Sequence, residues 1–516
     1  MRKWLIGGIL VLLVAGGAYY AVAIYPTKLF RDALDQTLRT LPAGQTGSYA
    51  SVSFSLLSRK ATVTGAAFHR SDPNGFDLTA SEIDVTRPAT DFGDAWARAA
   101  ANPGAIAPDL ALVLGDDVTA RDVSYRDDSA TLKLATFQVA QPRAYPWALL
   151  HPDVPSMVEA RSHLLEGTHA PDAADILPLL RAEAAWAYGF GYDSYSAQSL
   201  DATAAMPPTS TTKGGTIAYT VEKMSSGAYD RGNAASIAID GTVVRSDVFG
   251  VITIAHVGLE ELHAAKALAQ LVAGDVPSPA MLDGLTLKRI VYGPMTLQPL
   301  KGASSELGNF ALANIAFSHG LLSSGDLALD GVRVRRDQMP TPALAAGFEQ
   351  LGIDAATVSL ALGYRWDIDQ KRMSIKGATL KVVELGRLVI GLDIDQVASQ
   401  ADLLSQGRFV RGTARYEDAS LVNRALKFFA GNQGVDPEVL RKQVIAAVGE
   451  LEADTRNDAA TRGTAHAIAA FMAAPNSLQV DLAPPQPVPL VALLGVSNMT
   501  PDRSIVMFGV TATANK

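Results

Sequence analysis

Residues 360–368 read LALGYRWDI, and large apolar side chains alternate in them with small or charged ones. Successive side chains of a β-strand point to opposite faces of its sheet, so this period of two predicts a strand with one buried and one solvated face. Residues 373–382 and 388–394 continue the alternation. Together they predict an antiparallel meander with one apolar and one charged face.

Two carboxylate pairs lie in the charged phase of these strands, Asp367 with Asp369 and Asp393 with Asp395. Residues two apart in a strand share a face, so each pair has the spacing to bind calcium or to act as acid and base. A fully formed apolar phase lies beside them, which favours a solvated face without chemistry.

Short strands and turns fill most of the remaining chain, so the expected fold is mainly β with interspersed helices (α+β). Its core element would be an elongated, curved antiparallel sheet on an N-terminal transmembrane helix. The expected divisions are a membrane segment (1–25), a membrane-proximal helix with a first β region (26–140), a helical, proline-rich insertion or boundary (141–195), a second β region (196–335) and a meander with C-terminal helices (336–516).

Three Asp-Gly pairs, at 240–241, 283–284 and 330–331, accept the positive φ angles of tight hairpin turns and predict such turns. A helix is predicted over residues 259–272, and a last strand near residues 505–510.

Helix signals are sharpest at two places. Gly434 can end a helix that begins near Leu421, and Asp436 before Pro437 has the order of a helix start, with a cap residue followed by proline. Near the N-terminus, Leu34 and Leu38 lie on one face of a predicted helix. That helix is expected to cover the first sheet, with a helix lying on lipid headgroups as the alternative.

The run from Trp4 to Tyr25 contains no charged residue and follows Arg2 and Lys3. About twenty apolar residues match the thickness of a bilayer, so the run can span a membrane. A cleavable signal peptide is the alternative, because Ala21-Val22-Ala23 fits the small-residue cleavage pattern. The basic start favours a cytoplasmic N-terminus, and both alternatives export the rest of the chain.

Composition narrows the function. The chain has no cysteine, which excludes disulfides and thiolate chemistry, and its formal net charge of −8 argues against nucleic acid as a partner. The motifs of common hydrolases and nucleotide-binding proteins are missing. His151, His163 and His169 lack the spacing and supporting ligands of a zinc site, so no metal, cofactor or catalytic residue is predicted.

The tail carries a resemblance. Residues 351–353 before the amphipathic strand, 364–367, 416–421 and 477–480 before a proline-rich stretch resemble uncharacterised single-anchor envelope proteins of Gram-negative bacteria. More distantly, a membrane helix followed by β-rich repeats is similar to the AsmA-like group. The resemblance covers roughly residues 340–500. It implies a periplasmic protein, single-pass in the bacterial inner membrane, with a curved apolar sheet face that carries lipid.

The expected function is therefore that of a non-enzymatic envelope protein that holds or transfers lipid. Its expected partners are the membrane bilayer, phospholipid and other envelope proteins. A structural or assembly subunit of a membrane complex is the alternative, and an exported hydrolase with a dispersed site comes third. Within the apolar phase, Tyr364 and Trp366 are expected in the core more than on a platform that stacks a ligand. The positions expected to face lipid are Leu360, Leu362, Tyr364, Trp366, Leu388, Ile390 and Leu392.

Overall fold

A computed structural model describes most of the chain from residue 44 onward and a few residues before it. The described residues are 27, 31, 34–35, 38–39, 44–55, 58–71, 75–89, 92–155, 173–206, 214–302, 304–338, 341–399, 401–454, 457–493 and 501–516. The predicted membrane segment 1–25, His163 and His169 lie outside them. None of the described helices has the length and apolar character needed to cross a bilayer.

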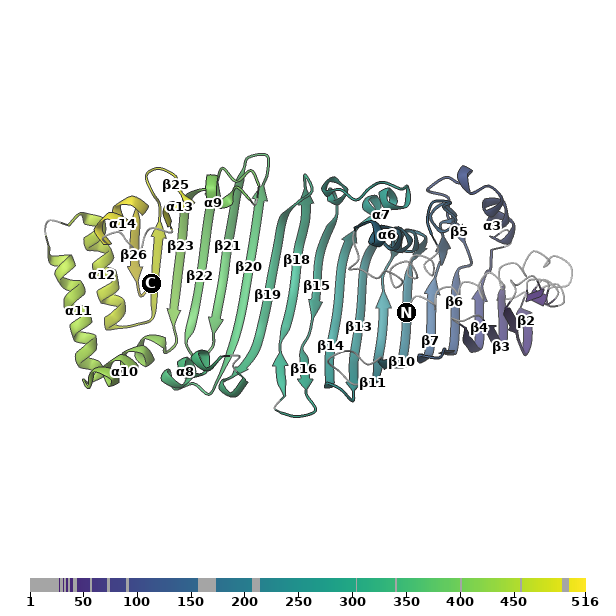
Figure 1. The fold of residues 1–516 in the computed structure, drawn as a ribbon, viewed down its shortest axis with the longest axis horizontal. Coiled ribbons are helices and arrows are strands. Elements are labelled where there is room, and N and C mark those ends of the chain that lie inside the picture. The colour runs from purple at the N-terminus through teal and green to yellow at the C-terminus, as the bar shows by residue number, and fades with distance from the viewer. Residues whose placement is uncertain are drawn as a thin grey trace. The chain divides into compact units, whose positions relative to one another are not determined.

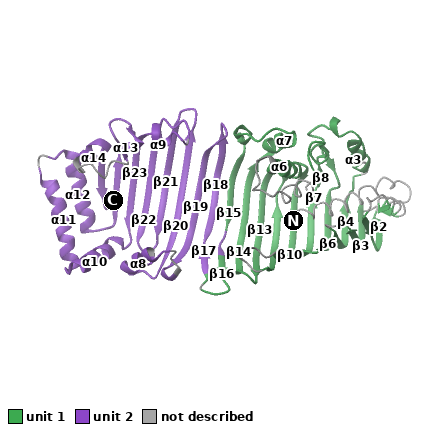
Figure 2. Ribbon diagram, viewed as in Figure 1, with its two compact units in different colours: residues 1–292, 296–304 green, residues 293–295, 305–516 purple. Residues whose placement is uncertain are grey.

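The chain forms two compact units (Figure 2). Unit 1 comprises residues 1–292 and 296–304, and unit 2 comprises residues 293–295 and 305–516. The change from one unit to the other falls inside the segment that the sequence assigns to the second β region. Antiparallel strands dominate both units, which confirms the mainly β prediction.

Unit 1 is built on an antiparallel sheet in which β3 pairs with β4, and β6, β7, β10, β11, β13, β14 and β15 follow in that order. The short strands β5, β8, β9 and β12 pair with one another in that order and join β13. The strand bounds are β1 Gln45–Ser48, β2 Ser51–Ser55, β3 Lys60–Arg70, β4 Phe76–Thr86, β5 Leu112–Val113, β6 Asp117–Arg126, β7 Ala130–Ala140, β8 Arg143–Ala144, β9 Phe190–Tyr192, β10 Ser194–Met206, β11 Gly215–Ser226, β12 Tyr229–Asp230, β13 Asn233–Ser246, β14 Gly250–His263, β15 Thr286–Tyr292 and β16 Met295–Gln298.

Helices lie against this sheet (Figure 1). They are α3 Phe92–Ala101, α4 Pro146–Leu149, α6 Ala173–Tyr188 and α7 Ala265–Val272, with 3₁₀ turns η2 Pro103–Ala105 and η3 Pro279–Leu282. Helices α4, α6 and α7 share one apolar cluster that includes Ala148, Tyr188 and Val272. Leu34 is helical, 1 % exposed and packed with the first strands, as the prediction of a helix against the first sheet requires of this residue.

The strands of unit 1 change phase in their middle. The buried apolar residues of β4 are Phe76, Leu78 and Ala80, and then Ile83 and Val85, so the apolar alternation moves by one residue between the two sets. The partner strand β3 moves at the same level, next to Gly65, and the pairing register is kept on both sides. One face of the sheet therefore stays apolar along the whole strand.

From β3 to β13, a residue with positive φ sits at this level in every second strand of the sheet. These residues are Gly65 in β3, Asp122 in β6, Ser199 in β10 and Gly241 in β13. Neighbouring strands take up the same displacement, so the row of kinks crosses the sheet. Kinks of this kind bend strands and increase their local twist.

Unit 2 continues the same kind of architecture with an antiparallel meander from β18 through β19, β20, β21, β22, β23 and β24 to β26. Its strands are β17 Ser305–Leu307, β18 Asn309–Ser318, β19 Leu321–Arg335, β20 Ala355–Asp367, β21 Arg372–Val382, β22 Gly386–Asp395, β23 Arg408–Asp418, β24 Ser477–Leu482, β25 Val488–Pro489 and β26 Val510–Ala514. Its helices are η4 Arg336–Gln338, α8 Pro342–Gln350, α9 Leu403–Gln406, α10 Leu421–Gln433, α11 Pro437–Ala453, α12 Ala459–Ala473, α13 Leu490–Leu493 and α14 Pro501–Phe508.

The predicted meander and its helix caps are confirmed. Gly434 ends α10 in the left-handed conformation, with a φ of 66°. Asp436 caps α11 by accepting a hydrogen bond from the backbone N–H of Glu438. Tyr416 contacts Phe471 of α12 with a ring-centroid distance of 6.2 Å, so this helix covers the apolar side of β23.

The polar face of unit 2 consists of ion pairs across neighbouring strands. Arg365 pairs with Asp326 at 2.7 Å, and Arg372 pairs with Asp395 at 2.8 Å. Asp393 pairs with Arg411. Because arginine partners occupy Asp393 and Asp395, the interpretation of these carboxylates as a solvated face is the one the structure favours.

The predicted Asp-Gly hairpin turns at 240–241 and 330–331 are wrong. Both pairs lie inside long strands, β13 and β19, with φ angles of 65° at Gly241 and 70° at Gly331. The residue with positive φ shifts the alternation of the strand by one position. The sequence on both sides of it therefore alternates, just as it does on both sides of a hairpin turn. Asp283-Gly284 does form a turn, but it connects η3 to β15.

Two further elements differ from prediction. Residues 259–263 belong to β14, and the helix begins only at Ala265. Leu259 and Leu262 pair with Ile290 and Leu287 across a kink, and this kink creates the spacing of three that imitates a helix. The last strand starts at Val510, because residues 501–508 form α14.

Replacing Gly331 with valine should lower the free energy of unfolding by about 1–2 kcal/mol, because a β-branched residue is strained at positive φ. Space is not the cause, since an added Cβ would lie 3.7 Å from its nearest atom, Cα of Gly308. Urea denaturation measures the change. Gly331→Asn is the control and should stay near wild type, because asparagine accepts this conformation.

Among the described residues of unit 1, Asp84 of β4 is the most buried charged side chain, and it lies in an ionic cluster. Its side chain is 5 % exposed and contacts Lys60 at 2.7 Å, Arg121 at 3.0 Å and the hydroxyl of Thr62 at 2.7 Å. Burial alone would raise the pKa of Asp84, but the hydrogen bonds from these three residues together hold it below its usual value.

Asp84→Asn should therefore cost about 1–3 kcal/mol of stability at pH 7. A carboxyl with a lowered folded-state pKa stabilises above its unfolded pKa and loses this contribution as the pH falls through the folded pKa. The difference between wild type and variant should thus shrink below about pH 4. Urea titrations at a series of pH values test this, and a difference that does not depend on pH would contradict it.

Candidate apolar ligand site

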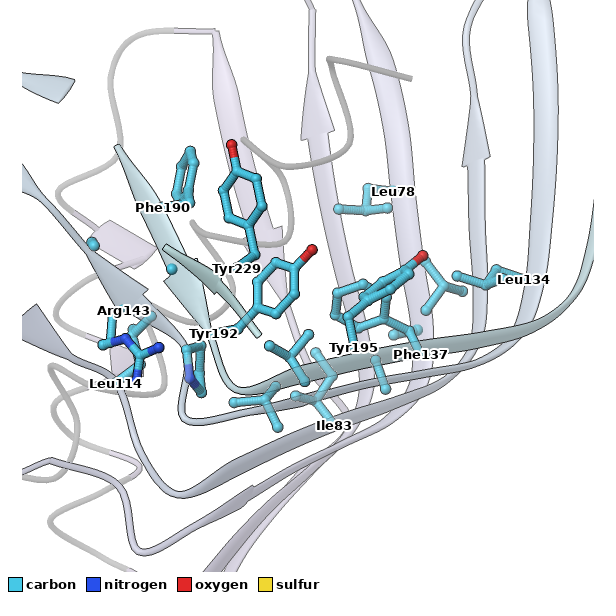
Figure 3. A pocket seen from close by; sticks show the side chains of 18 of the residues that line it. Leu78, Ile83, Leu114, Leu134, Phe137, Arg143, Phe190, Tyr192, Tyr195 and Tyr229 are labelled. Atoms are coloured by element: carbon cyan, nitrogen blue, oxygen red, sulfur yellow. The ribbon is translucent and has the colours of Figure 1, made fainter. Parts of the chain in front are cut away.

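A cavity of about 600 Å³ lies inside unit 1, between the sheet and its helices (Figure 3). Strands β3, β4, β6, β7, β10 and β11 supply one wall, and α3, α4 and α6 with the short strands β8, β9 and β12 supply the other. The side chains that line it are mostly aliphatic or aromatic. Its size falls in the range of roughly 300–1,000 Å³ that is typical of small-molecule sites.

Aromatic rings form a connected row through this cavity. Phe137 of β7 meets Tyr195 of β10 edge-on at 5.4 Å between ring centroids, and Tyr195 lies 6.1 Å from Tyr192 of β9. Tyr192 in turn stacks on Tyr229 of β12 at 5.4 Å. These rings bring the main sheet and the short strands together and hold the cavity between them.

The tyrosine hydroxyls of this row differ in their partners. The hydroxyl of Tyr229 donates to the carbonyl oxygen of Ala187 at 2.7 Å, and that of Tyr192 donates to Ser226 Oγ at 3.2 Å. Among the described residues, the hydroxyl of Tyr195 has no hydrogen-bond partner. Burial, with a further contribution from Tyr192, raises the pKa of Tyr195 to about 12, so it stays a donor at neutral pH.

Two charged side chains line the cavity, Arg143 of β8 and Glu183 of α6. Arg143 lies at one side of the labelled group and Leu134 lies at the opposite side (Figure 3). The Arg143 side chain is 22 % exposed, and its guanidinium contacts the Asp193 carboxylate at 2.8 Å. A Cβ placed on Gly191 would come within 3.2 Å of Arg143 Nε, so glycine at this position leaves room for the guanidinium.

The positions that the sequence predicts to face lipid lie in unit 2. Leu360, Leu362 and Ile390 are 40, 40 and 41 % exposed on the apolar face of β20 and β22. Leu380 of β21, which pairs with Leu360, is 44 % exposed. We call these four residues the open belt. Tyr364, Leu388 and Leu392 share the face but are half-buried.

Trp366 is a correction to this predicted set. It is 3 % exposed, and its indole N–H donates to the carbonyl oxygen of Val397 at 3.0 Å. It packs with Ile394 and Phe409 in the closed core of unit 2. Because Trp366 is buried on all sides, no ligand can reach it. This agrees with the expectation that its side chain belongs to the core and not to a platform that stacks a ligand.

The unit 1 cavity was missed by the sequence reasoning. A signal exists in residues 186–195, WAYGFGYDSY, which concentrate five aromatic side chains at the end of α6 and directly after it. Four of them, Trp186, Phe190, Tyr192 and Tyr195, line the cavity. The pattern could have marked an aromatic-lined site, but which strands meet these rings depends on pairing that the sequence does not display.

Neither a metal centre nor a catalytic group is prominent in the described part of the chain. Its His, Asp and Glu side chains form no group of three suited to hold a metal ion. His151 stands against Trp147 with ring centroids 5.5 Å apart. The apolar lining of the cavity suits an apolar group, and Arg143 offers a guanidinium for an anion.

Comparison with known proteins adds one match. A family described only as an uncharacterized protein matches residues 370–515, which run from the turn before β21 to the C-terminal strand β26. No curated protein and no solved structure matches the chain.

Proposed function

We propose that this protein is a non-enzymatic, membrane-anchored protein of the bacterial envelope that holds or transfers lipid on the apolar faces of a curved, elongated antiparallel sheet. Residues 4–25 would anchor it in the inner membrane and leave the remaining chain in the periplasm. Phospholipid and the bilayer are its proposed partners.

The observation that supports lipid binding most directly is the cavity of about 600 Å³ in unit 1. A sheet that packed its whole apolar face into a closed core would leave no such space. Water in an apolar pocket finds few polar partners, so an apolar molecule that displaces this water from the pocket is favoured. An acyl chain is the apolar group that a membrane supplies.

The open belt of unit 2 is the second support. Four large aliphatic side chains on three adjacent strands are each 40–44 % exposed, although the polar face of the same strands is satisfied by ion pairs. Adjacent exposed apolar residues of this kind are typical of surfaces that contact another apolar body. A lipid chain along the strands would remove this surface from water.

Native mass spectrometry of the full-length protein, extracted gently from membranes, tests this function, with organic extraction of what co-purifies. We expect stoichiometric lipid. Alkaline carbonate extraction of the membranes tests the anchor, which should keep the protein in the pellet. A lipid-free protein would contradict the proposal and leave the sheet as a self-packed scaffold.

An assembly role in a membrane complex is the second candidate, and exposed apolar residues on the terminal helices favour it. Phe429 of α10 is 54 % exposed, and Val439 and Leu451 of α11 are 46 and 47 % exposed. This role predicts a stable partner in detergent pull-downs that Phe429→Ser releases. Monomeric behaviour in every detergent would count against it.

A further inference from the structure

We infer that the unit 1 cavity binds one amphiphile with a single acyl chain and an anionic head group, with the head at Arg143 and the chain running toward Leu134. This inference rests on the proposed function and specifies the class of lipid for one of its two apolar surfaces. The head group is a carboxylate or a phosphate, which the same guanidinium chemistry recognises.

The cavity's polarity sets the orientation of the chain. Arg143 is at one end, in β8, whereas the opposite end is formed by aliphatic side chains such as Leu78 and Leu134 (Figure 3). An acyl chain lying the other way would place its charged head against leucine side chains. Burying an unpaired charge there costs far more than the chain gains, so only one orientation is compatible with the lining.

Arg143 has donors left for a ligand. A guanidinium carries five N–H donors, and the described contact to Asp193 uses one nitrogen at 2.8 Å. Asp193 is itself 57 % exposed, so it faces water as well as Arg143. An anionic head group can therefore bind the guanidinium beside Asp193 or displace the Asp193 carboxylate from it. The contact with Asp193 also holds Arg143 in place before the ligand binds.

Cavity size favours one chain over two. A water molecule occupies about 30 Å³ of liquid, and a methylene group, also one heavy atom with two hydrogens, is of similar size. A cavity of about 600 Å³ then holds roughly twenty such groups, enough for one ordinary acyl chain. A lipid with two chains of ordinary length would need well over that volume.

The walls support an inserted chain along its length. Ala120 of β6 and Leu134 of β7 lie on the sheet side, and Trp186 of α6 lies on the helix side. Each methylene group moved from water into such surroundings adds to the affinity, so chain length is its main source. Arg143 then selects which head group accompanies the chain.

The test uses the delipidated full-length protein and native mass spectrometry with four added probes. Two are anionic with one chain, hexadecanoic acid and 1-hexadecanoyl-glycerol-3-phosphate. One is neutral with one chain, 1-hexadecanoylglycerol, and one is a two-chain phosphatidylglycerol. Wild type should retain one molecule of an anionic single-chain probe, and the stronger of the two distinguishes a carboxylate head from a phosphate head.

Two variants and a control locate the site. Ala120→Phe places a ring in the middle of the sheet-side wall and narrows the cavity, so it should lower occupancy by either anionic single-chain probe at least tenfold. Arg143→Gln should weaken binding of the two anionic single-chain probes about tenfold and leave binding of the neutral probe unchanged. Unfolding of the variant would instead weaken binding of all three. Arg245→Gln changes an exposed arginine of β13 outside the cavity and should bind as wild type does.

Other outcomes overturn the inference in distinguishable ways. Anionic single-chain binding that survives Ala120→Phe would place the ligand outside the cavity, and equal loss of neutral and anionic probes in Arg143→Gln would remove the head-group role. Both results leave the proposed function standing. A wild-type protein that binds none of the four probes and carries no lipid from membranes would end both.

Discussion

Trp366→Ala should lower the free energy of unfolding of unit 2 by about 3–5 kcal/mol, the range for removing a large buried aromatic side chain. The indole is 3 % exposed, and the substitution removes both its packing against Phe409 and Ile394 and its hydrogen bond to Val397. Urea denaturation followed by far-UV circular dichroism, a signal that does not depend on the removed tryptophan, measures the change in the free energy of unfolding. The remaining cavity would sit in the core that joins four strands to the short helices α13 and α14.

Leu362→Ala is the matched control for Trp366→Ala. Leu362 lies in the same strand and on the same face, but it is 40 % exposed, so its truncation should cost well under half as much. Trp366→Phe should recover most of the stability because it keeps a ring in the core. Equal losses at both positions would mean that the apolar face of β20 is uniformly packed and that the belt is not open.

Placing aspartates at Leu362 and Ile390 together should remove most of the two-chain phospholipid that co-purifies with the protein, by at least tenfold. Both side chains are about 40 % exposed, so the folded protein can keep the new carboxylates in water. A lipid chain on the belt would have to bury them, which is far more costly than burying leucine. Organic extraction and phosphate analysis of the purified protein give the amount.

The control for the double variant adds a charge to the opposite face. Thr379 of β21 pairs with Ala361 and Val389, on the polar side of the same three strands. Thr379→Asp should leave the phospholipid content unchanged. If it reduced phospholipid as much as the belt aspartates do, net charge and not the apolar face would explain the loss.

Sequence periodicity was sufficient for much of unit 2. The alternation in residues 360–368, the left-handed Gly434 and the cap residue Asp436 are local signals, and each appears where it was expected. The open exposure of Leu360, Leu362 and Ile390 also follows from their strand phase. Trp366 differs from them only because the segments around Val397 and Val488 fold over its end of the sheet, and that contact is not local.

The errors share one physical cause. A kink with positive φ inside a strand favours the same residue types as a hairpin turn. For this reason the sequence predicts turns at Asp240-Gly241 and Asp330-Gly331, where the structure has kinks. The same kink at Glu261 gave a strand the spacing of a helix. The unit 1 cavity depends on which kinked strands become neighbours, and only the paired structure provides that information.

The row of kinks in unit 1 also constrains how such a chain can change in length during evolution. Deleting one residue from β4 would turn Phe76, Leu78 and Ala80 toward the polar side, while β3 and β6 on either side kept their own phase. Neither neighbour could then pair with both halves of the altered strand. Insertions and deletions are therefore tolerated in the connections between strands, and the sheet itself can grow only by whole hairpins that bring a matching kink with them.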